Sequence, residues 1–379
     1  MKLLVAAMAM VAVRAAADPL RLRADAFATT ATPAGIISLA AEGEAGPNVA
    51  AEAVVWTGGA KVGDDVHGDV LVVALRARTS DGRASARVGR FVAMLGALRP
   101  VQVDGAAARL RLGYGVDIET VGGIPVSVGG RSWDWLVGGR IARRIGDMGS
   151  IGVAYIHQRD AGRLAFEEVG FDAGVAVSKR SDIGGKLAYD LANPGVAEMA
   201  LTASHRAKAW RADVYSSYRA ASHLLPATSL FSVIGDVPSQ RLGVTVTWQA
   251  APRLAVIADA GVRRVNADYA PAIVARARLK LDDRGASTVS GELRRDGVGD
   301  PWTGARASAR VAVGRWLYTS GELELVVRDR GNVWPWGLVA FGWDNGTWQA
   351  AVAGEALASP EYVHRVDVLA QLGRRWGGR

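Results

Sequence analysis

Apolar and polar residues alternate with a period of two along most of this chain. In residues 109–119 the apolar positions are Leu110, Leu112, Tyr114, Val116 and Ile118. The intervening positions are charged or glycine, namely Arg109, Arg111, Gly113, Gly115, Asp117 and Glu119. Because successive side chains of a β-strand point to opposite faces, this segment is predicted to be a strand with one apolar and one charged face.

The same alternation recurs in further segments, and a helical period is hard to find. These segments cover residues 197–206, 273–281, 304–313, 322–330 and 365–373. Glycine, aspartate, asparagine and proline gather in the short breaks between segments, as expected for tight turns. Longer connectors are predicted at residues 58–68, 95–105, 122–134, 220–239 and 296–304. Short and long connectors alternate over much of the C-terminal half.

A direct count gives about 21 strands after residue 17. A barrel whose two ends lie on the same side of a membrane needs an even number of strands. The alternation is broken at residues 88–91, so we expect the error to lie around residues 84–106. The prediction is therefore about 20 strands, with 18 to 22 compatible with the pattern.

Periodicity alone does not decide which face of such a sheet is wet. A β-sandwich buries its apolar faces, whereas a membrane barrel turns them to lipid and encloses its charges. Four features favour the barrel. The apolar faces consist of Ala, Val and Leu, which suit contact with lipid, and the strands of about 10 to 13 residues are long enough to cross a membrane at a tilt. Tryptophans lie near the strand ends, where the membrane interface would be, and a closed barrel leaves no exposed edge strands. The predicted fold is all-β, a transmembrane antiparallel up-and-down β-barrel. The alternative is a soluble secreted protein of β-sandwiches.

Tryptophans near the predicted strand ends are expected to form part of an interfacial girdle. They are Trp210, Trp248, Trp302, Trp316, Trp334, Trp336, Trp343, Trp348 and Trp376. The candidates chosen from this set as interface aromatics are Trp210, Trp248, Trp316, Trp343, Trp348 and Trp376.

The N-terminus has the features of an export signal. Lys2 precedes an apolar run over residues 3–13, and Ala15, Ala16 and Ala17 supply the small residues of a cleavage site. We expect a signal peptide over residues 1–17 and a single barrel domain over residues 18–379.

Composition removes several other classes of protein. The 379 residues include no cysteine, which excludes a disulfide framework, a thiolate metal site and a cysteine nucleophile. The hydrophobic fraction of 50% is ordinary for a folded protein. No run of 18 apolar residues exists, so a membrane-spanning helix is excluded.

With its export signal, strand pattern and closing strand at residues 364–376, the chain resembles the outer-membrane β-barrel proteins of Gram-negative bacteria, and among them the porin-like channels. Trp376 lies in phase with Leu372 and matches the terminal aromatic of such barrels, although Arg374 interrupts the face and three residues follow Trp376. The resemblance implies an outer-membrane location, contact with outer-membrane lipid, recognition of the last strand by the barrel-assembly machinery, and association into a homo-oligomer.

The barrel suggests passive diffusion of small hydrophilic solutes, because about 20 strands enclose an aqueous channel. Alternation begins at Leu20, so no room is expected for a plug domain before the first strand. The pore-lining candidates are Arg109, Arg111, Asp117, Glu119, Arg276, Arg278, Lys280, Arg306, Arg310, Glu322, Glu324 and Arg328. Inward arginines favour anions, but pairing with inward acids would leave at most a mild preference.

Two connectors are candidates for a constriction of the channel. Residues 220–239 are too apolar for a freely solvated loop, and residues 95–105 contain two bends, at Arg99-Pro100 and Asp104-Gly105. Each could instead pack elsewhere on the barrel.

Catalytic chemistry has little support in the sequence. The five histidines show no metal-ligand spacing, and Ser222-His223 is the only local hint of a hydrolase site at the barrel rim. We expect neither an enzyme nor a cofactor, and nucleic acid is not an expected partner. A structural or surface-display barrel that does not conduct remains the main functional alternative.

Overall fold

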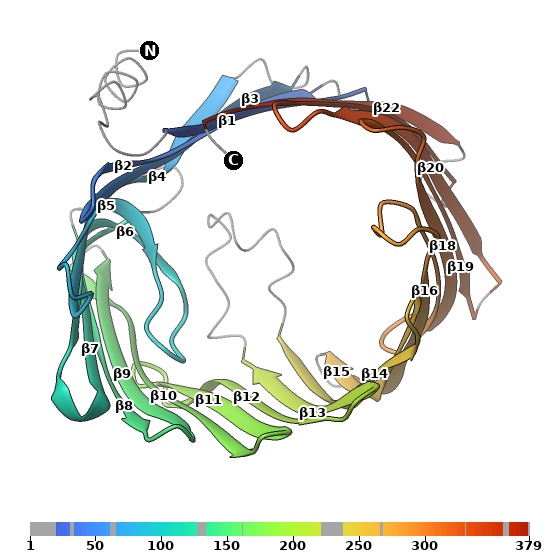
Figure 1. The fold of residues 1–379 in the computed structure, drawn as a ribbon. Coiled ribbons are helices and arrows are strands. Elements are labelled where there is room, and N and C mark those ends of the chain that lie inside the picture. The colour runs from blue at the N-terminus through green and yellow to red at the C-terminus, as the bar shows by residue number, and fades with distance from the viewer. Residues whose placement is uncertain are drawn as a thin grey trace.

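The alternating segments form strands, and the strands form a single closed sheet (Figure 1). The computed structural model describes residues 20–30, 34–60, 66–126, 134–160, 162–220, 238–265, 268–329, 331–358 and 364–377. The predicted signal peptide over residues 1–17 lies outside these residues.

Twenty-two antiparallel strands build the wall. In chain order they are β1 (Arg21–Thr29), β2 (Ala34–Gly46), β3 (Val49–Ala60), β4 (Val66–Arg78), β5 (Ala84–Ala93), β6 (Val101–Arg111), β7 (Val116–Pro125), β8 (Leu136–Ile145), β9 (Gly149–Asp160), β10 (Arg163–Ser178), β11 (Ser181–Asp190), β12 (Gly195–Arg206), β13 (Trp210–Arg219), β14 (Ser239–Ala251), β15 (Leu254–Val265), β16 (Asp268–Lys280), β17 (Thr288–Asp296), β18 (Trp302–Ala312), β19 (Leu317–Arg328), β20 (Val333–Asp344), β21 (Trp348–Leu357) and β22 (Arg365–Trp376). A one-turn 3₁₀ helix, η1 (Gly113–Gly115), joins β6 to β7. The prediction of a single strand over residues 109–119 was therefore wrong: the segment holds the end of β6, this turn with Tyr114 at a positive φ of 58°, and the start of β7.

The predicted barrel is confirmed, and the strand number lies at the top of the predicted range. The irregular region around residues 84–106 holds two strands, β5 and β6, separated by residues 94–100. The connector predicted at 95–105 was therefore too long at its C-terminal end, because β6 already begins at Val101. A pair of β-sandwiches is ruled out, since all strands belong to one sheet that closes on itself.

The seam between β1 and β22 closes the barrel. Leu22 pairs with Trp376 and Asp25 pairs with Gly373. A Cβ atom on Gly373 would lie 2.7 Å from the Asp25 carboxylate, so glycine leaves the space that this buried carboxylate occupies. Arg23 donates to Asp25 at 2.6 Å and neutralises it. The seam therefore follows the same scheme as the rest of the wall, with paired charges on one face and apolar residues on the other.

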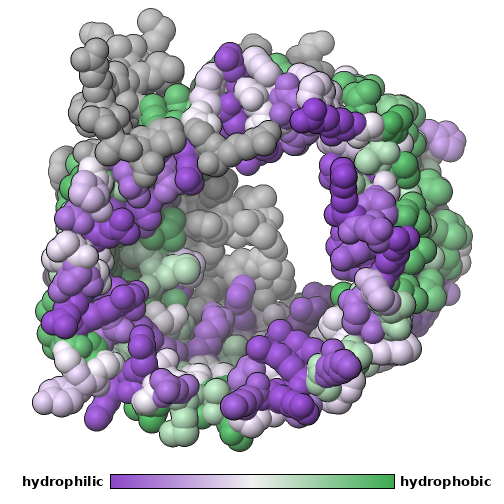
Figure 2. All heavy atoms as spheres, in the orientation of Figure 1, coloured by the Kyte–Doolittle hydropathy of each residue, from purple (hydrophilic) through white to green (hydrophobic). Residues whose placement is uncertain are grey.

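The two faces of the wall have opposite polarity. Large apolar side chains are exposed on the outside, among them Val366 at 74% and Leu323 and Phe341 at 67%. Figure 2, which looks along the barrel axis, shows hydrophobic residues on the outer surface beside β16–β20 and hydrophilic residues around an opening inside. An apolar belt outside a polar interior suits a barrel surrounded by lipid.

Because the strand number is even, β1 begins and β22 ends at the same end of the barrel, which we call the terminal end. The connectors there are mostly tight turns, such as 47–48, 146–148, 179–180 and 252–253. The opposite end, which we call the loop end, has the longest connectors, including 126–135 and 220–238. Among the residues that the structure describes, no helix is long and apolar enough to cross a membrane.

Replacing an outward leucine should reveal the lipid-facing surface. Leu323→Arg places a charge in the middle of β19 on the outer face, and we expect it to lower the free energy of unfolding by about 2–4 kcal/mol in lipid vesicles. Ser320→Arg, on the inner face of the same strand, should change it by less than about 1 kcal/mol. The measurement is denaturant unfolding in vesicles, and equal effects of the two variants would contradict the assignment of faces.

Candidate pore lining and inner constriction

The connector at residues 94–100 is the described segment that departs from the wall at the loop end. In Figure 1 the β5–β6 hairpin turns into the ring instead of ending at the rim. A Cβ atom on Gly138 would lie 2.8 Å from Leu95, and one on Gly170 would lie 2.9 Å from Leu98. Glycines on β8 and β10 therefore make room for this connector on the inner face of the wall.

An apolar cluster lies beneath the connector, inside a barrel whose interior is mostly polar. Leu95 and Leu98 of the connector are buried, together with the wall residues Phe91, Leu136 and Ile156. Burying these side chains stabilises the connector on the wall by the hydrophobic effect. The connector and the wall thus form a small hydrophobic core on one side of the lumen, of the kind found in soluble proteins.

A buried ion pair fixes the C-terminal part of the connector. The Nε of Arg99 donates to Glu168 of β10 at 2.9 Å, and its guanidinium lies 4.6 Å from the centre of the Phe166 ring. Arg99 is 8% exposed and Glu168 is fully buried. Because an isolated buried charge is costly, removing either partner would leave the other without its compensating charge.

A second ion pair and a glycine fix the N-terminal part of the connector. Arg140 of β8 donates to Asp172 of β10 at 2.6 and 3.0 Å. Gly96 lies directly over this pair with a positive φ of 56°, and a Cβ atom there would lie 2.2 Å from the Asp172 carboxylate. Both the backbone conformation and the close approach require glycine at this position.

Of the two connectors predicted as constrictions, residues 94–100 occupy the inner wall. Residues 221–237, which make up nearly all of the other one, lie outside the described residues. Sequence reasoning named residues 95–105 but missed their partners. Gly138, Gly170 and Glu168 come from strands far along the chain.

The pore-lining candidates of β6 and β7 lie on the inner face. Arg109 pairs in register with Glu119, and Glu119 pairs with Arg140, which the connector places inside. Arg109 lies 3.4 Å from Asp117 and 3.5 Å from Glu119, and Arg111 lies 3.5 Å from Asp117. These arginines are therefore compensated by acids on the adjacent strand.

A belt of alternating charge crosses β16–β19 on the same inner face. One register row places Arg276, Glu292, Arg306 and Glu324 side by side on four consecutive strands. Arg276 donates to Glu292 at 2.7 Å, and Arg306 forms an ion pair with Glu322, diagonally below. Glu324 forms its ion pair with Arg294. We call this row, with Glu322 and Arg294, the neutral belt, because its three arginines and three glutamates cancel.

The remaining predicted pore-lining residues also share this inner face. Arg328 donates to Asp300 at 2.7 Å, in the half of the wall nearer the loop end. Arg278, Lys280 and Arg310 lie nearer the terminal end, in the rows below the neutral belt.

All six predicted interface aromatics lie near the terminal end. Trp210 pairs directly with Trp248 across β13 and β14. Trp343 and Trp348 flank the β20–β21 turn, Trp316 lies in the connector before β19, and Trp376 ends β22. They form an aromatic arc at one edge of the apolar surface.

Arg374 does not disrupt the apolar face of the last strand. Its guanidinium lies 4.6 Å from the ring centre of Trp348 and 4.6 Å from that of Trp376. A guanidinium between two indole rings near the membrane edge is stabilised by cation–π interactions.

Three tryptophans of the predicted girdle lie on the inner face instead. Trp302 pairs in register with Arg328, and Trp336 pairs with Glu324 and donates to Glu355 at 2.5 Å. Trp334 is two residues from Trp336 on the same face, beneath the Arg328 guanidinium at 3.7 Å. Their position near strand ends suggested the girdle, but they occupy the polar phase of their strands, and that signal could have excluded them.

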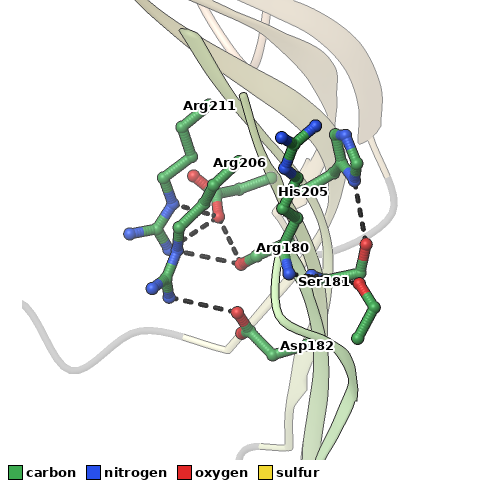
Figure 3. Close-up of polar contacts among 9 residues, drawn as sticks. Arg180, Ser181, Asp182, His205, Arg206 and Arg211 are labelled. Carbon is green, nitrogen blue, oxygen red and sulfur yellow. Dashed lines mark hydrogen bonds and ion pairs between the residues drawn. The ribbon is translucent and has the colours of Figure 1, made fainter. Parts of the chain in front are cut away.

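His205, near the β12–β13 turn, lies on the outer face in phase with Leu201. His205 is 2.8 Å from the Ser181 hydroxyl and its ring lies 5.4 Å from that of Trp210. Figure 3 shows this contact on one face of β11–β13 and Arg206, Asp182 and Arg211 on the other. On that inner face Arg206 forms an ion pair with Asp182, and Arg211 forms one with Asp213. Within the described ranges, no group of three histidine, aspartate or glutamate residues could hold a metal ion.

At the loop end, a bidentate ion pair ties a strand to a connector. Arg295 of β17 donates to both carboxylate oxygens of Asp329, at 2.5 and 2.7 Å. This guanidinium holds the pKa of the Asp329 carboxyl below its usual range. The pair therefore stays charged well into mildly acidic conditions.

No protein-family model and no curated protein matches the chain. Solved structures of outer-membrane barrels do match. The translocation pore of the P pilus usher PapC has a TM-score of 0.54 and 10% identity, over 95% of this chain and 100% of the usher chain. Two receptors of Pseudomonas aeruginosa cover 95% of this chain and 81% of their own: the siderophore receptor PirA (TM-score 0.57, 10% identity) and the ferric enterobactin receptor PfeA (0.60, 7%). At such identities the likeness shows the fold, which is that of outer-membrane β-barrels.

Breaking the buried pair should loosen the connector. Arg99→Met leaves Glu168 buried without its guanidinium, at a cost of about 3 kcal/mol. Amide hydrogen exchange in residues 94–100 should accelerate by about 100-fold. The double variant Arg99→Met/Glu168→Leu removes both charges and should recover most of the protection. Unchanged exchange in the single variant would contradict a role of this pair in holding the connector.

Proposed function

We propose that the protein is an outer-membrane channel for the passive diffusion of small hydrophilic solutes, including ions, with at most a mild preference for anions. The observation that carries this proposal is the opening in Figure 2, which is bordered by hydrophilic residues and enclosed by a wall with an apolar outside. Water and small polar solutes would meet charged side chains along this passage instead of lipid-like ones.

The charge pairing of the inner wall supports a weak preference. In the neutral belt each arginine has a carboxylate within ion-pair distance, and the same holds for Arg109 and Arg140. A wall of this kind is wet and strongly polar, yet its net field is small beyond a few ångströms. It would lower the barrier for solutes of either sign.

The connector at residues 94–100 would narrow the channel from one side. It lies against β8–β10, whereas the opening in Figure 2 lies toward β14–β22. Its apolar cluster and buried ion pair hold it in place, so we propose a fixed constriction and not a flexible lid.

Export and assembly belong to the same proposal. A Gram-negative outer-membrane location would use the signal peptide at residues 1–17, and the assembly machinery would read β22 with its outward Leu372 and Trp376. We also propose that the barrel associates into a homo-oligomer. Cell fractionation would test the outer-membrane location, and cross-linking would test the oligomeric state.

The central test is conductance of the refolded mature chain in planar lipid bilayers. We expect stepwise openings, and a reversal potential under a salt gradient that shifts only slightly toward that of the anion. A chain that inserts into the bilayer but stays electrically silent would favour the structural or surface-display alternative and overturn the channel.

Expelling the connector should widen the channel. Leu95→Asp/Leu98→Asp places two charges in the buried apolar cluster, which the folded connector cannot accommodate without cost. We expect single-channel conductance to rise beyond the scatter of the wild-type channels. Met94→Asp, at an exposed position of the same connector, is the matched control and should leave conductance unchanged. Equal conductance in both variants would argue against a constriction at this place.

A further inference from the structure

The inner wall of β16–β19 changes character toward the terminal end. The row of the neutral belt reads Arg276, Glu292, Arg306, Glu324. The next row reads Arg278, Ser290, Ser308, Glu322, and the last one reads Lys280, Thr288, Arg310, Ser320. Acids therefore disappear along this wall while cations and hydroxyl groups remain.

Arg278, Lys280 and Arg310, which we call the cationic patch, differ from the arginines of the belt. All three are exposed, and neither Arg278 nor Lys280 forms an ion pair with a described residue. The Arg310 guanidinium lies on the Tyr318 ring, 3.9 Å from its centre, which orients the group without neutralising it.

The acids closest to the patch in sequence and register are engaged elsewhere. Glu322 forms its ion pair with Arg306. Asp282 accepts the backbone N–H groups of Ala286 and Ser287 in the β16–β17 connector, and Asp283 pairs with Arg253 at 2.5 Å. The positive charge of the patch is thus open to a mobile anion.

The geometry of the patch suits one anion between several donors. Lys280 and Arg310 flank Thr288 in a single row, so their backbones are two strand spacings apart, about 10 Å. Side chains of this length can converge from both sides on one small group. The Ser290 and Ser308 hydroxyls lie 2.7 Å from each other in the row above and add neutral donors.

We propose that the cationic patch is a low-affinity binding site for solutes that carry a dianionic oxyanion group, such as inorganic phosphate or a phosphate monoester. This inference rests on the proposed channel and adds a solute class to it. Guanidinium, ammonium and hydroxyl donors together match a tetrahedral dianion, which can neutralise two of the three cations. Because the cations are exposed to water, binding is weak and compatible with release.

The test is inhibition of the chloride current by inorganic phosphate in planar bilayers at low salt. We expect saturable inhibition, reached at lower concentration when phosphate is added on the side of the terminal end. Sulfate should act like phosphate because it is also a tetrahedral dianion, whereas chloride added to the same ionic strength should not inhibit. Equal inhibition by chloride would overturn the site.

Substitutions that remove the cations test whether the inhibition by phosphate arises at the cationic patch. Arg278→Gln/Lys280→Gln/Arg310→Gln should raise the half-inhibiting phosphate concentration at least about tenfold, since it removes three charges from one site. Arg241→Gln removes a cation from the inner face of β14 near the loop end, and Arg276→Gln/Glu292→Gln removes a neutral pair from the belt. Both controls should stay within about twofold of the wild type.

The outcomes separate this inference from the channel itself. A conducting protein with no phosphate inhibition, or with inhibition that survives in the triple variant, would overturn the patch and leave the channel intact. A silent wild-type protein would overturn the channel. In that case calorimetric titration of the detergent-solubilised full chain with inorganic phosphate, in the wild type and triple variant, still decides whether the patch binds the anion.

Discussion

Backbone hydrogen bonding within lipid is the constraint on which the whole molecule depends. Hydrocarbon offers no partner to a free N–H or C=O group, so a sheet can cross a membrane only when it has no edges. The pairing of β1 with β22 removes the last two edges, and it requires an even number of antiparallel strands. Closure then fixes the period of two, because each strand must present one face to lipid and the other to the interior.

The inner face is therefore where the residue types of this barrel are least constrained. Its charged side chains are mostly matched in pairs of opposite sign. Arg276 meets Glu292, Arg109 meets Asp117 and Glu119, and even the seam has Arg23 on Asp25. Such pairs neutralise the inward charges and hold neighbouring strands in register. Departures from pairing are the informative places: the apolar cluster under residues 94–100, the inward tryptophans, and the cationic patch.

Much of this architecture follows from the order of residues. Alternation at residues 109–119 predicted a single strand, which was wrong, because the chain turns at Gly113–Gly115 and the segment is divided between β6 and β7. Its charged positions were nevertheless assigned to the correct side, since Arg109 and Arg111 lie opposite Glu119 and Asp117 on the inner face. The strand number was harder to obtain, because the alternation continues across the η1 turn and the ends of two strands resemble one strand. The predicted tryptophan girdle was partly wrong because Trp302, Trp334 and Trp336 were judged by their distance from a turn and not by their phase.

Pairing partners could not be predicted, because they depend on register and on the reach of each side chain. Arg306 lies opposite Glu324 but forms its ion pair with Glu322, one row away. Arg294 reaches past Gly304 to Glu324, since that glycine leaves the space between them free. The position of residues 94–100 could not be predicted for the same reason, because it depends on residues of distant strands. Nothing in their own sequence indicates that Gly138 and Gly170, on strands much later in the chain, leave a place for two leucines.

The arrangement of these features along one wall bears on how a channel of this kind would discriminate. On the β14–β20 side, a solute coming from the loop end passes Arg328 and the inward tryptophans, then the neutral belt, then the cationic patch. Paired charges contribute little field, and a Debye length of about 8 Å at physiological salt confines the field of the patch to its own surroundings. On this part of the described wall, sign preference would therefore arise mainly near the terminal end, while the paired charges of the neutral belt treat both signs alike. A short charged segment in series with a neutral one gives a selectivity that falls steeply with salt, because screening acts on the segment that distinguishes the ions.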